Sequence, residues 1–205
     1  MTHYILGLLT ADGSAREYCT ISGESTYSCD LEMAEEQIIL DIAKFLNKTV
    51  FYRERVIKNK QRKFWKVSFH TNDIEMIKYG KYLVKGRPKI YELYKSFSKP
   101  ERADFVRGLF DGDGVCSYET SHKKKKVRIG FCGHNRDFVE NYRNFLINKL
   151  DMNQTKLFNT GGCWQCSWSS KKDLINFYNY IYKDATIFLG RKKKKISDYV
   201  NTEVT

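Results

Sequence analysis

Proline is scarce in this sequence, and long hydrophobic runs are absent. Only two prolines occur in 205 residues, and no low-complexity segment separates one part of the chain from another. No apolar stretch approaches the roughly 20 residues that span a bilayer, and the first residues lack the positively charged start of a signal peptide. We therefore expect a compact, soluble, intracellular protein without a membrane partner.

The composition indicates a folded and basic protein. Hydrophobic residues make up 41% of the chain and aromatic residues 15%, which excludes a disordered chain. A length of 205 residues accommodates one large domain or two small ones. The net charge of +12 suits a polyanionic partner, although charge alone does not separate nucleic acid from an anionic membrane.

The six cysteines do not form a metal-binding pattern. Cys163 and Cys166 form an isolated C-x-x-C, and Cys132 and His134 could be thought to complete a zinc site. However, residues 163–168 alternate as a strand does, which places Cys163 and Cys166 on opposite faces. Zinc sites also need a second ligand pair at suitable spacing, and none is present here. The sequence favours reduced cysteines packed in strands.

A nine-residue motif occurs twice. ILGLLTADG at residues 5–13 returns as VRGLFDGDG at residues 106–114, an offset of 101 residues. Each copy has the pattern of an apolar helix with small residues four positions apart, on one helical face. Small residues at that spacing let two helices pack closely. The matched positions are Gly7 with Gly108, Ala11 with Gly112, and Asp12 with Asp113.

Close packing of the two motif helices would bring their acidic ends together. Each helix is expected to end at its aspartate, so Asp12 and Asp113 would emerge side by side. Two like charges so close would favour protonation of one carboxyl group. A bound divalent cation would remove this conflict, because hard cations such as Mg²⁺ take carboxylate and phosphate oxygens as ligands.

The remaining elements repeat in the same order. In the first half we expect strands at 15–21, 25–32, 51–57 and 64–70, a polar turn at 58–62, and a helix at 34–46. In the second half we expect a hairpin with lysines 123–126 at its tip, a helix at 135–146, a hairpin that turns at Gly161–Gly162, and a helix at 171–182, followed by the basic segment GRKKKK and a last helix.

The paired motifs resemble the LAGLIDADG family of homing endonucleases, in the form that carries two motifs on one chain. The resemblance implies an α+β fold of two pseudo-symmetric αββαββα halves. Paired motif helices would form the interface, and two antiparallel sheets would form a saddle over DNA. We expect the halves at 1–97 and 98–205, connected at about 96–104, where Pro100 is a natural breaker. Thr10 departs from the family pattern, which often has an acidic residue there.

The outer faces of the predicted strands carry polar and basic side chains. A half-buried antiparallel sheet leaves one face exposed to solvent. Strands that lie in a major groove can present the side chains of that face to base edges. Lysine-rich hairpin tips would contact phosphates. Each of these residues alone could equally be a solvated surface charge. The predicted DNA-binding residues are Arg53, Arg55, Lys66, Ser68, His70, Lys124, Lys125, Arg128, Gln165 and Ser167.

The resemblance implies metal-dependent phosphodiester hydrolysis. Asp12 and Asp113 would be catalytic and would hold two or more Mg²⁺ or other divalent ions, assisted by the backbone oxygens of Ala11 and Gly112. Two such cations activate water and stabilise both the attacking and the leaving oxygen. Each carboxylate would serve one strand of the duplex, and cleavage across the minor groove would leave short 3′ overhangs.

In the family, a basic residue just before the last helix of each half completes the site. The candidates here are Lys85 and Arg87 in the first half, and Arg191 and Lys192 in the second. The register within LVKGRPK and GRKKKK is not fixed by the sequence. Phosphate positioning alone is an alternative role for these residues.

Other functions remain compatible with parts of the pattern. Residues 111–119 look slightly like a calcium loop, but Val115 and Cys116 replace a required ligand and glycine. Both aspartates could merely cap helices in a DNA-binding regulator that does not cut. An RNA-splicing maturase with an intron RNA partner is a further alternative. An intein is disfavoured, because the sequence starts with Met1 just ahead of the motif and ends NTEVT, without nucleophile-bearing splicing ends. We expect a monomer that cuts a long, imperfectly palindromic DNA site.

Overall fold

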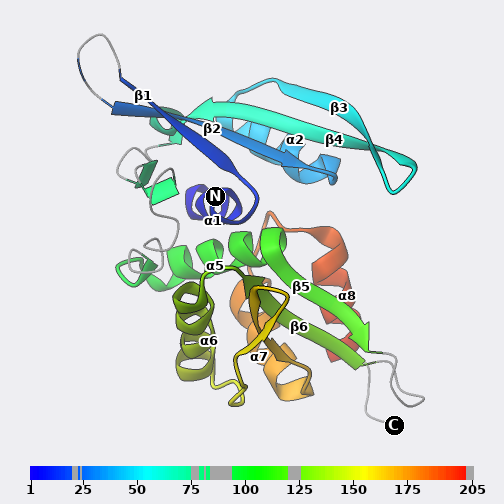
Figure 1. Ribbon diagram of the computed structural model, residues 1–205. Helices are drawn as coiled ribbons and strands as arrows, with labels where there is room; N and C mark the ends of the chain where they lie inside the picture. The colour runs from blue at the N-terminus through cyan, green and yellow to red at the C-terminus, as the bar shows by residue number, and fades with distance from the viewer. Residues whose placement is uncertain are drawn as a thin grey trace.

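The protein contains two four-stranded antiparallel sheets with two central helices between them (Figure 1). The structure is a computed structural model that describes residues 1–19, 23, 25–74, 79–80, 82–83, 94–119 and 126–201. The central helices are α1 (Thr2–Ala11) and α5 (Lys99–Asp113), which contain the two motifs. No helix within the described ranges is long and apolar enough to cross a membrane.

The two sheets have the same strand order. The first sheet runs β1-β2-β4-β3 and the second runs β5-β6-β8-β7, and every pairing is antiparallel. The pseudo-symmetric α+β fold predicted from the repeat is therefore confirmed. The strands are β1 (Ser14–Cys19), β2 (Ser25–Met33), β3 (Val50–Ile57), β4 (Lys60–His70), β5 (Gly114–Glu119), β6 (Lys126–Gly133), β7 (Phe158–Thr160) and β8 (Cys163–Trp168).

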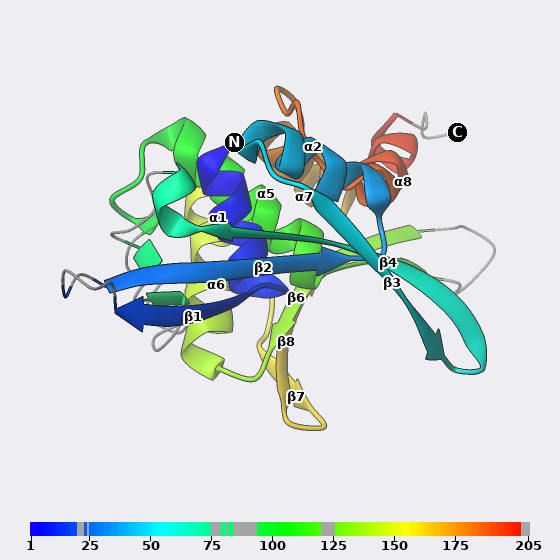
Figure 2. The ribbon, with the colours of Figure 1, turned by 90° about the horizontal axis from the view of Figure 1, so that it is seen from above.

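Helices pack against one face of each sheet. Viewed from above, α2 lies along the first sheet and the β3–β4 and β7–β8 hairpins project outward (Figure 2). The C-terminal half closes with two helices, the one predicted at 171–182 and the predicted last helix, which is one helix more than the αββαββα scheme names. The remaining helical elements are α2 (Glu36–Leu46), the 3-10 helix η1 (Thr71–Ile74), α6 (Arg136–Leu150), α7 (Lys171–Ile181) and α8 (Gly190–Val200).

Helix α5 begins inside the segment that the sequence indicated as the connection between the halves. We expected a linker at 96–104, but α5 already begins at Lys99. Pro100 does not break the helix, because proline is tolerated in the first turn, where the backbone N–H needs no intrahelical partner. The backbone N–H of Ser98 donates to the Glu101 carboxylate at 2.8 Å, which fixes the start of the helix. The domain boundary near residue 97 stays a prediction.

The hairpin turns follow ordinary turn chemistry. The turn between β3 and β4 contains only Lys58 and Asn59, both with positive φ, so residues 60–62 belong to the strand rather than to the predicted turn at 58–62. Two central residues with positive φ match the right-handed twist of the strands. The predicted turn at Gly161 and Gly162 is confirmed, with φ of +58° and +85°.

Side chains alternate along the strands as predicted. Val67 and Phe69 of β4 are buried, whereas Lys66 and Ser68 occupy the opposite face. Because successive side chains point to opposite faces, each sheet has one apolar face toward the helices and one polar face. We call the polar face of each sheet its open face.

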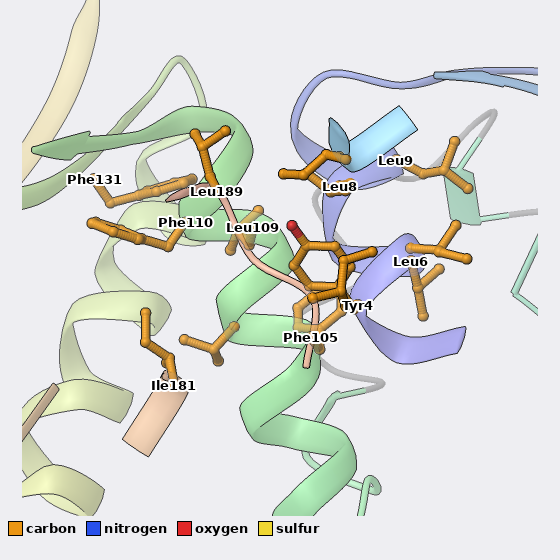
Figure 3. Packing of buried hydrophobic residues seen from close by; sticks show 14 of the residues in the cluster. Tyr4, Leu6, Leu8, Leu9, Phe105, Leu109, Phe110, Phe131, Ile181 and Leu189 are labelled. Atoms are coloured by element: carbon orange, nitrogen blue, oxygen red, sulfur yellow. The ribbon is translucent and has the colours of Figure 1, made fainter. Parts of the chain in front are cut away.

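The two central helices touch backbone to backbone. A Cβ atom added at Gly7 would lie 2.2 Å from the carbonyl oxygen of Phe105, and one at Gly108 would lie 2.1 Å from that of Tyr4. Figure 3 shows Tyr4 and Leu8 of α1 packed beside Phe105 and Leu109 of α5. Glycine is needed at both positions, because any side chain would push the helices apart.

Substitution of Gly108 by alanine should strongly destabilise the protein. The new methyl group would meet the backbone of Tyr4, which cannot move without displacing α1. We expect a loss of about 3 kcal/mol in the free energy of unfolding, measured by urea denaturation. Gly190→Ala is the matched control, since its Cβ would meet nothing within 4 Å in the first turn of α8. Equal denaturation midpoints for the two variants would contradict the assigned packing.

Candidate active site and nucleic-acid interface

The two motif aspartates lie at the shared end of the central helices. Asp12 directly follows α1, and Asp113 is the last residue of α5. A Cβ atom added at Gly112 would lie 2.4 Å from Cβ of Ala11 and 3.1 Å from Oδ2 of Asp12. The Asp12 carboxylate therefore lies close to Gly112 at the end of α5, and Gly112 is the residue before Asp113. The C-terminal ends of helices carry partial negative charge, so this location favours a cation.

Lys192 connects α8 to this end of α5. Its ammonium group donates to the carbonyl oxygens of Phe110 at 2.6 Å, Asp111 at 2.9 Å and Gly112 at 3.1 Å. These carbonyls lie in the last turn of α5, where a helix leaves backbone oxygens to be satisfied by other groups. That of Phe110 also accepts from the backbone N–H of Gly114, and the lysine caps all three. Only 3% of Lys192 is exposed. Burial lowers its pKa from 10.5 to about 8, although the nearby charge of Asp111 acts in the opposite direction.

The other predicted basic residues do not share this position. Arg191 and Lys192 both lie in the first turn of α8 rather than before the helix. Arg191 is exposed and forms an ion pair with Glu35, at the start of α2 in the other half. Lys85 and Arg87 lie outside the described residues.

The first acidic position of the motif is used differently in the two halves. Thr10 donates a hydrogen bond to the carbonyl oxygen of Leu6 at 2.8 Å, within its own helix. Its counterpart Asp111 is completely buried and accepts hydrogen bonds from Tyr4, Tyr182 and the backbone N–H of Leu189. Burial raises the pKa of Asp111, against the opposing effect of these hydrogen bonds. Asp111 thus ties α1, α5 and the segment before α8 together.

The open face of the first sheet carries half of the predicted DNA-binding residues. Arg53 forms an ion pair with Glu32 at 2.6 Å, and Arg55 pairs with the same carboxylate. Lys66 and Ser68 both donate to Asp30, at 2.9 and 2.6 Å. The predicted residues are thus brought to one surface, where neighbouring carboxylates hold them in place.

Sequence reasoning missed several residues of this surface. Strand register places Arg16 and Arg62 on the open face, because they lie opposite Ser28 and Arg55. The alternation of residues 14–18 could have revealed Arg16, but the predicted turn at 58–62 concealed Arg62. Basic residues outnumber Asp30 and Glu32 on this described surface. Burial acts to raise the pKa of Asp30, but Ser68, Lys66 and Arg16 outweigh it and hold this pKa below its usual range.

His70 ends the same surface. It is the last residue of β4, lies opposite Ser28 of β2, and is exposed. Its backbone N–H donates to the Asp73 carboxylate at 2.7 Å. This bond fixes where β4 passes into η1.

The open face of the second sheet is less basic within the described residues. Arg128 forms an ion pair with Glu119. Gln165 lies opposite Cys132 on β6, and Ser167 lies opposite Gly130. Lys124 and Lys125, at the predicted hairpin tip, lie outside the described residues. As predicted, the cysteines of the C-x-x-C occupy opposite faces: Cys166 is buried, and the sulfur of Cys163 lies 3.7 Å from Nδ1 of His134.

The paired acidic site offers oxygen ligands for a hard cation. Two carboxylates and the backbone oxygens near Ala11 and Gly112 lie where two helices end. Across the described ranges, no group of three or more histidine, cysteine, aspartate or glutamate side chains is placed to hold a metal ion. Mg²⁺ suits such an incomplete set, because it is commonly held by one or two carboxylates plus substrate phosphates. The residues present therefore fit this metal.

Comparison with known proteins agrees with this arrangement. Neither a protein-family model nor a curated protein matches the sequence. Solved structures do match. The homing endonuclease I-WcaI, bound to its DNA recognition sequence, gives a TM-score of 0.69 with 16% identity, over 95% of this chain and 84% of that one. I-DmoI in complex with DNA and Mn gives 0.53 with 19% identity, over 90% and 97%. The LAGLIDADG meganuclease I-AabMI, bound to uncleaved DNA, gives 0.55 with 14% identity, over 97% and 88%.

Fold, motif pairing and strand order together define a class. The chain has the LAGLIDADG homing endonuclease fold in its single-chain, two-motif form, as the paired motifs predicted.

Burial of Lys192 should make stability depend on pH. Its pKa is about 8 in the folded protein and 10.5 in the unfolded chain, so the unfolded state binds more protons between these values and stability rises with pH. Lys192→Met removes this titration. From about pH 7 to about pH 9.5, the wild type should gain about 2 kcal/mol of unfolding free energy relative to the variant. Lys194→Met, which removes an exposed lysine of the same helix, is the control. A pH-independent difference between wild type and Lys192→Met would refute this assignment.

Proposed function

We propose that this protein is a site-specific endonuclease that cuts both strands of a DNA duplex by metal-dependent hydrolysis. One observation carries the proposal. Asp12 and Asp113 lie together at the end of two helices that pack closely through glycine. The two sheets beside them carry polar and basic side chains on their open faces. The neighbouring structures I-WcaI and I-DmoI are bound to DNA, which supports the same partner here.

Asp12 and Asp113 are the proposed catalytic carboxylates, one for each strand. They would hold divalent ions such as Mg²⁺, with the backbone oxygens of Ala11 and Gly112 as further ligands. When bound, the metal supplies an activated water and neutralises charge on the scissile phosphate. The I-DmoI structures with Mn and with Mg support divalent metal use in this fold.

Lys192 is the proposed basic residue of the second half. Its three hydrogen bonds fix the carbonyl oxygens at the end of α5, including that of Gly112. A carbonyl oxygen has two lone pairs, so Gly112 can accept from Lys192 and still face a cation. The lysine would thereby position a ligand and place positive charge near the phosphate. Arg191, Lys85 and Arg87 are proposed to contact phosphates.

The two open faces would lie along the major groove of each half-site. Arg53, Arg55 and Arg128 suit guanine, and Gln165 suits adenine. Glu32 orients Arg53 and Arg55, and Glu119 orients Arg128, but these carboxylates also oppose the negative charge of DNA. Because the two faces differ in sequence, the target would be an imperfect palindrome bound by a monomer.

Substitution of either aspartate by asparagine should separate cleavage from binding. Asp113→Asn removes a metal-binding charge while keeping shape, so we expect at least a thousandfold loss of double-strand cleavage and binding within about threefold of wild type. Cleavage is measured on a genomic or randomised DNA library with Mg²⁺ and with a chelator. Asp151→Asn, at an exposed position far from the site, is the control.

The outcomes of this experiment are distinct. Discrete cuts that need both metal and the two aspartates support an endonuclease. Specific retention of DNA without cuts by the wild type would show a binding protein that has lost cleavage. Efficient double-strand cutting by Asp113→Asn would refute the catalytic role.

Removal of the Glu32 charge should strengthen DNA binding. Glu32 neutralises Arg53 and Arg55 on the open face, so Glu32→Gln would free both guanidinium groups for DNA. We expect affinity to rise about five- to tenfold at low salt and less at high salt, as measured by fluorescence anisotropy. Glu54→Gln is the matched control, because residue 54 lies on the same strand between Arg53 and Arg55 and on the other face. Unchanged or weaker binding by Glu32→Gln would show that this face does not meet DNA.

A further inference from the structure

We infer that Phe51 and Phe158 are a matched pair of specificity-determining residues, each contacting the 5-methyl group of a pyrimidine in one half-site. This inference rests on the proposed DNA-binding function and names part of the target. Neither side chain carries a charge or a hydrogen-bonding group, so a search for basic and polar residues does not identify them as DNA-binding residues.

The two phenylalanines occupy equivalent positions. Phe51 of β3 lies opposite Lys66 of β4, and Phe158 of β7 lies opposite Gln165 of β8. The two sheets have the same strand order. Lys66 precedes Val67, which lies opposite Leu31 of β2, and Gln165 precedes Cys166, which lies opposite Phe131 of β6. A pseudo-twofold axis between the halves therefore relates Phe51 to Phe158.

Both rings are exposed on the open faces. Residues directly opposite in an antiparallel pair share a face, so Phe51 lies with Lys66 and Phe158 lies with Gln165. Phe51 is 61% exposed and Phe158 is 42% exposed. Apolar side chains in such a place contribute nothing to the core, and exposed apolar groups among polar ones typically mark binding surfaces.

The chemistry of the major groove limits what a phenyl ring can contact there. The edges of guanine, adenine and cytosine present hydrogen-bond donors and acceptors, whereas thymine also presents the C5 methyl group. A phenyl ring gains by covering a methyl group and leaves donors and acceptors unsatisfied elsewhere. 5-Methylcytosine carries a methyl group at the same ring position. The preferred base at each position is therefore a 5-methylpyrimidine.

Symmetry places the two contacts. Under a pseudo-twofold axis, equivalent residues contact opposite DNA strands at equal distances from the centre of the target. The target should thus contain a thymine at one position in one half-site and another thymine on the opposite strand at the matching position. Phe51 would contact one of these thymines and Phe158 the other.

Selection from a randomised duplex library tests this placement. The full-length wild type, Phe51→Ser and Phe158→Ser are each used to enrich bound duplexes, which are then sequenced. Phe51→Ser should lose the thymine preference in one half-site only, and Phe158→Ser should lose it at the symmetric position only. Tyr52→Ser and Asn159→Ala are the matched controls, because they lie next to the phenylalanines but on the opposite sheet faces. Both should select the wild-type sequence.

The main comparison of a second measurement uses the wild type alone, so it does not depend on folding of the variants. In the duplex that the wild type selects, each of the two thymines is replaced by uracil, which removes only the methyl group. Wild-type affinity should fall about three- to fivefold for each replacement, and 5-methylcytosine should be preferred to cytosine. Phe51→Ser should show no effect of uracil at its own position.

The possible results separate this inference from the function that underlies it. If the wild type enriches no sequence, both the proposed function and this inference fail. If it enriches a sequence that both serine variants also select with thymines intact, the inference alone is overturned. It is also overturned if uracil leaves wild-type affinity unchanged.

Discussion

The close approach of α1 to α5 is the constraint on which the rest of the structure depends. Backbone atoms of the two helices meet at Gly7 and Gly108, where no side chain fits. Such a contact fixes the distance between the helices and also the relative position of the two sheets that follow them. It places Asp12 and Asp113 at one end, because each aspartate terminates its helix. The catalytic proposal and the pseudo-symmetric placement of the open faces both follow from this single packing.

Two buried polar groups near the C-terminal end of α5 hold this arrangement together. Asp111 accepts hydrogen bonds from Tyr4, Tyr182 and the backbone of Leu189, and Lys192 caps the last carbonyls of the helix. Buried polar groups are costly unless they are satisfied, and these two are satisfied by partners from different parts of the chain. The first half has Thr10 where the second has Asp111, so the two halves share a fold without sharing the same support.

The open faces combine basic residues with carboxylates that restrain them. Arg53 and Arg55 share Glu32, and Lys66 shares Asp30 with Ser68. Pairs of this kind contribute little stability when exposed, but they fix the direction of long side chains. If this surface binds DNA as proposed, its prior orientation reduces the conformational entropy lost on binding. The carboxylates also reduce sequence-independent attraction to phosphates, so affinity would depend more on the correct bases.

The sequence by itself determined the motif helices, the strands and the pseudo-symmetric repeat. Small residues four apart, period-two alternation and glycine turns are local patterns that need no partner to be recognised. Only the tertiary structure decided which residues meet. It selected Lys192 from a run of basic residues, because one helical face alone points at the end of α5. It made Asp111 a structural group through contacts about 70 to 110 residues apart in sequence. It also set the register that places Phe51 opposite Lys66 and Phe158 opposite Gln165, since pairing between strands depends on the packed sheet rather than on any one segment.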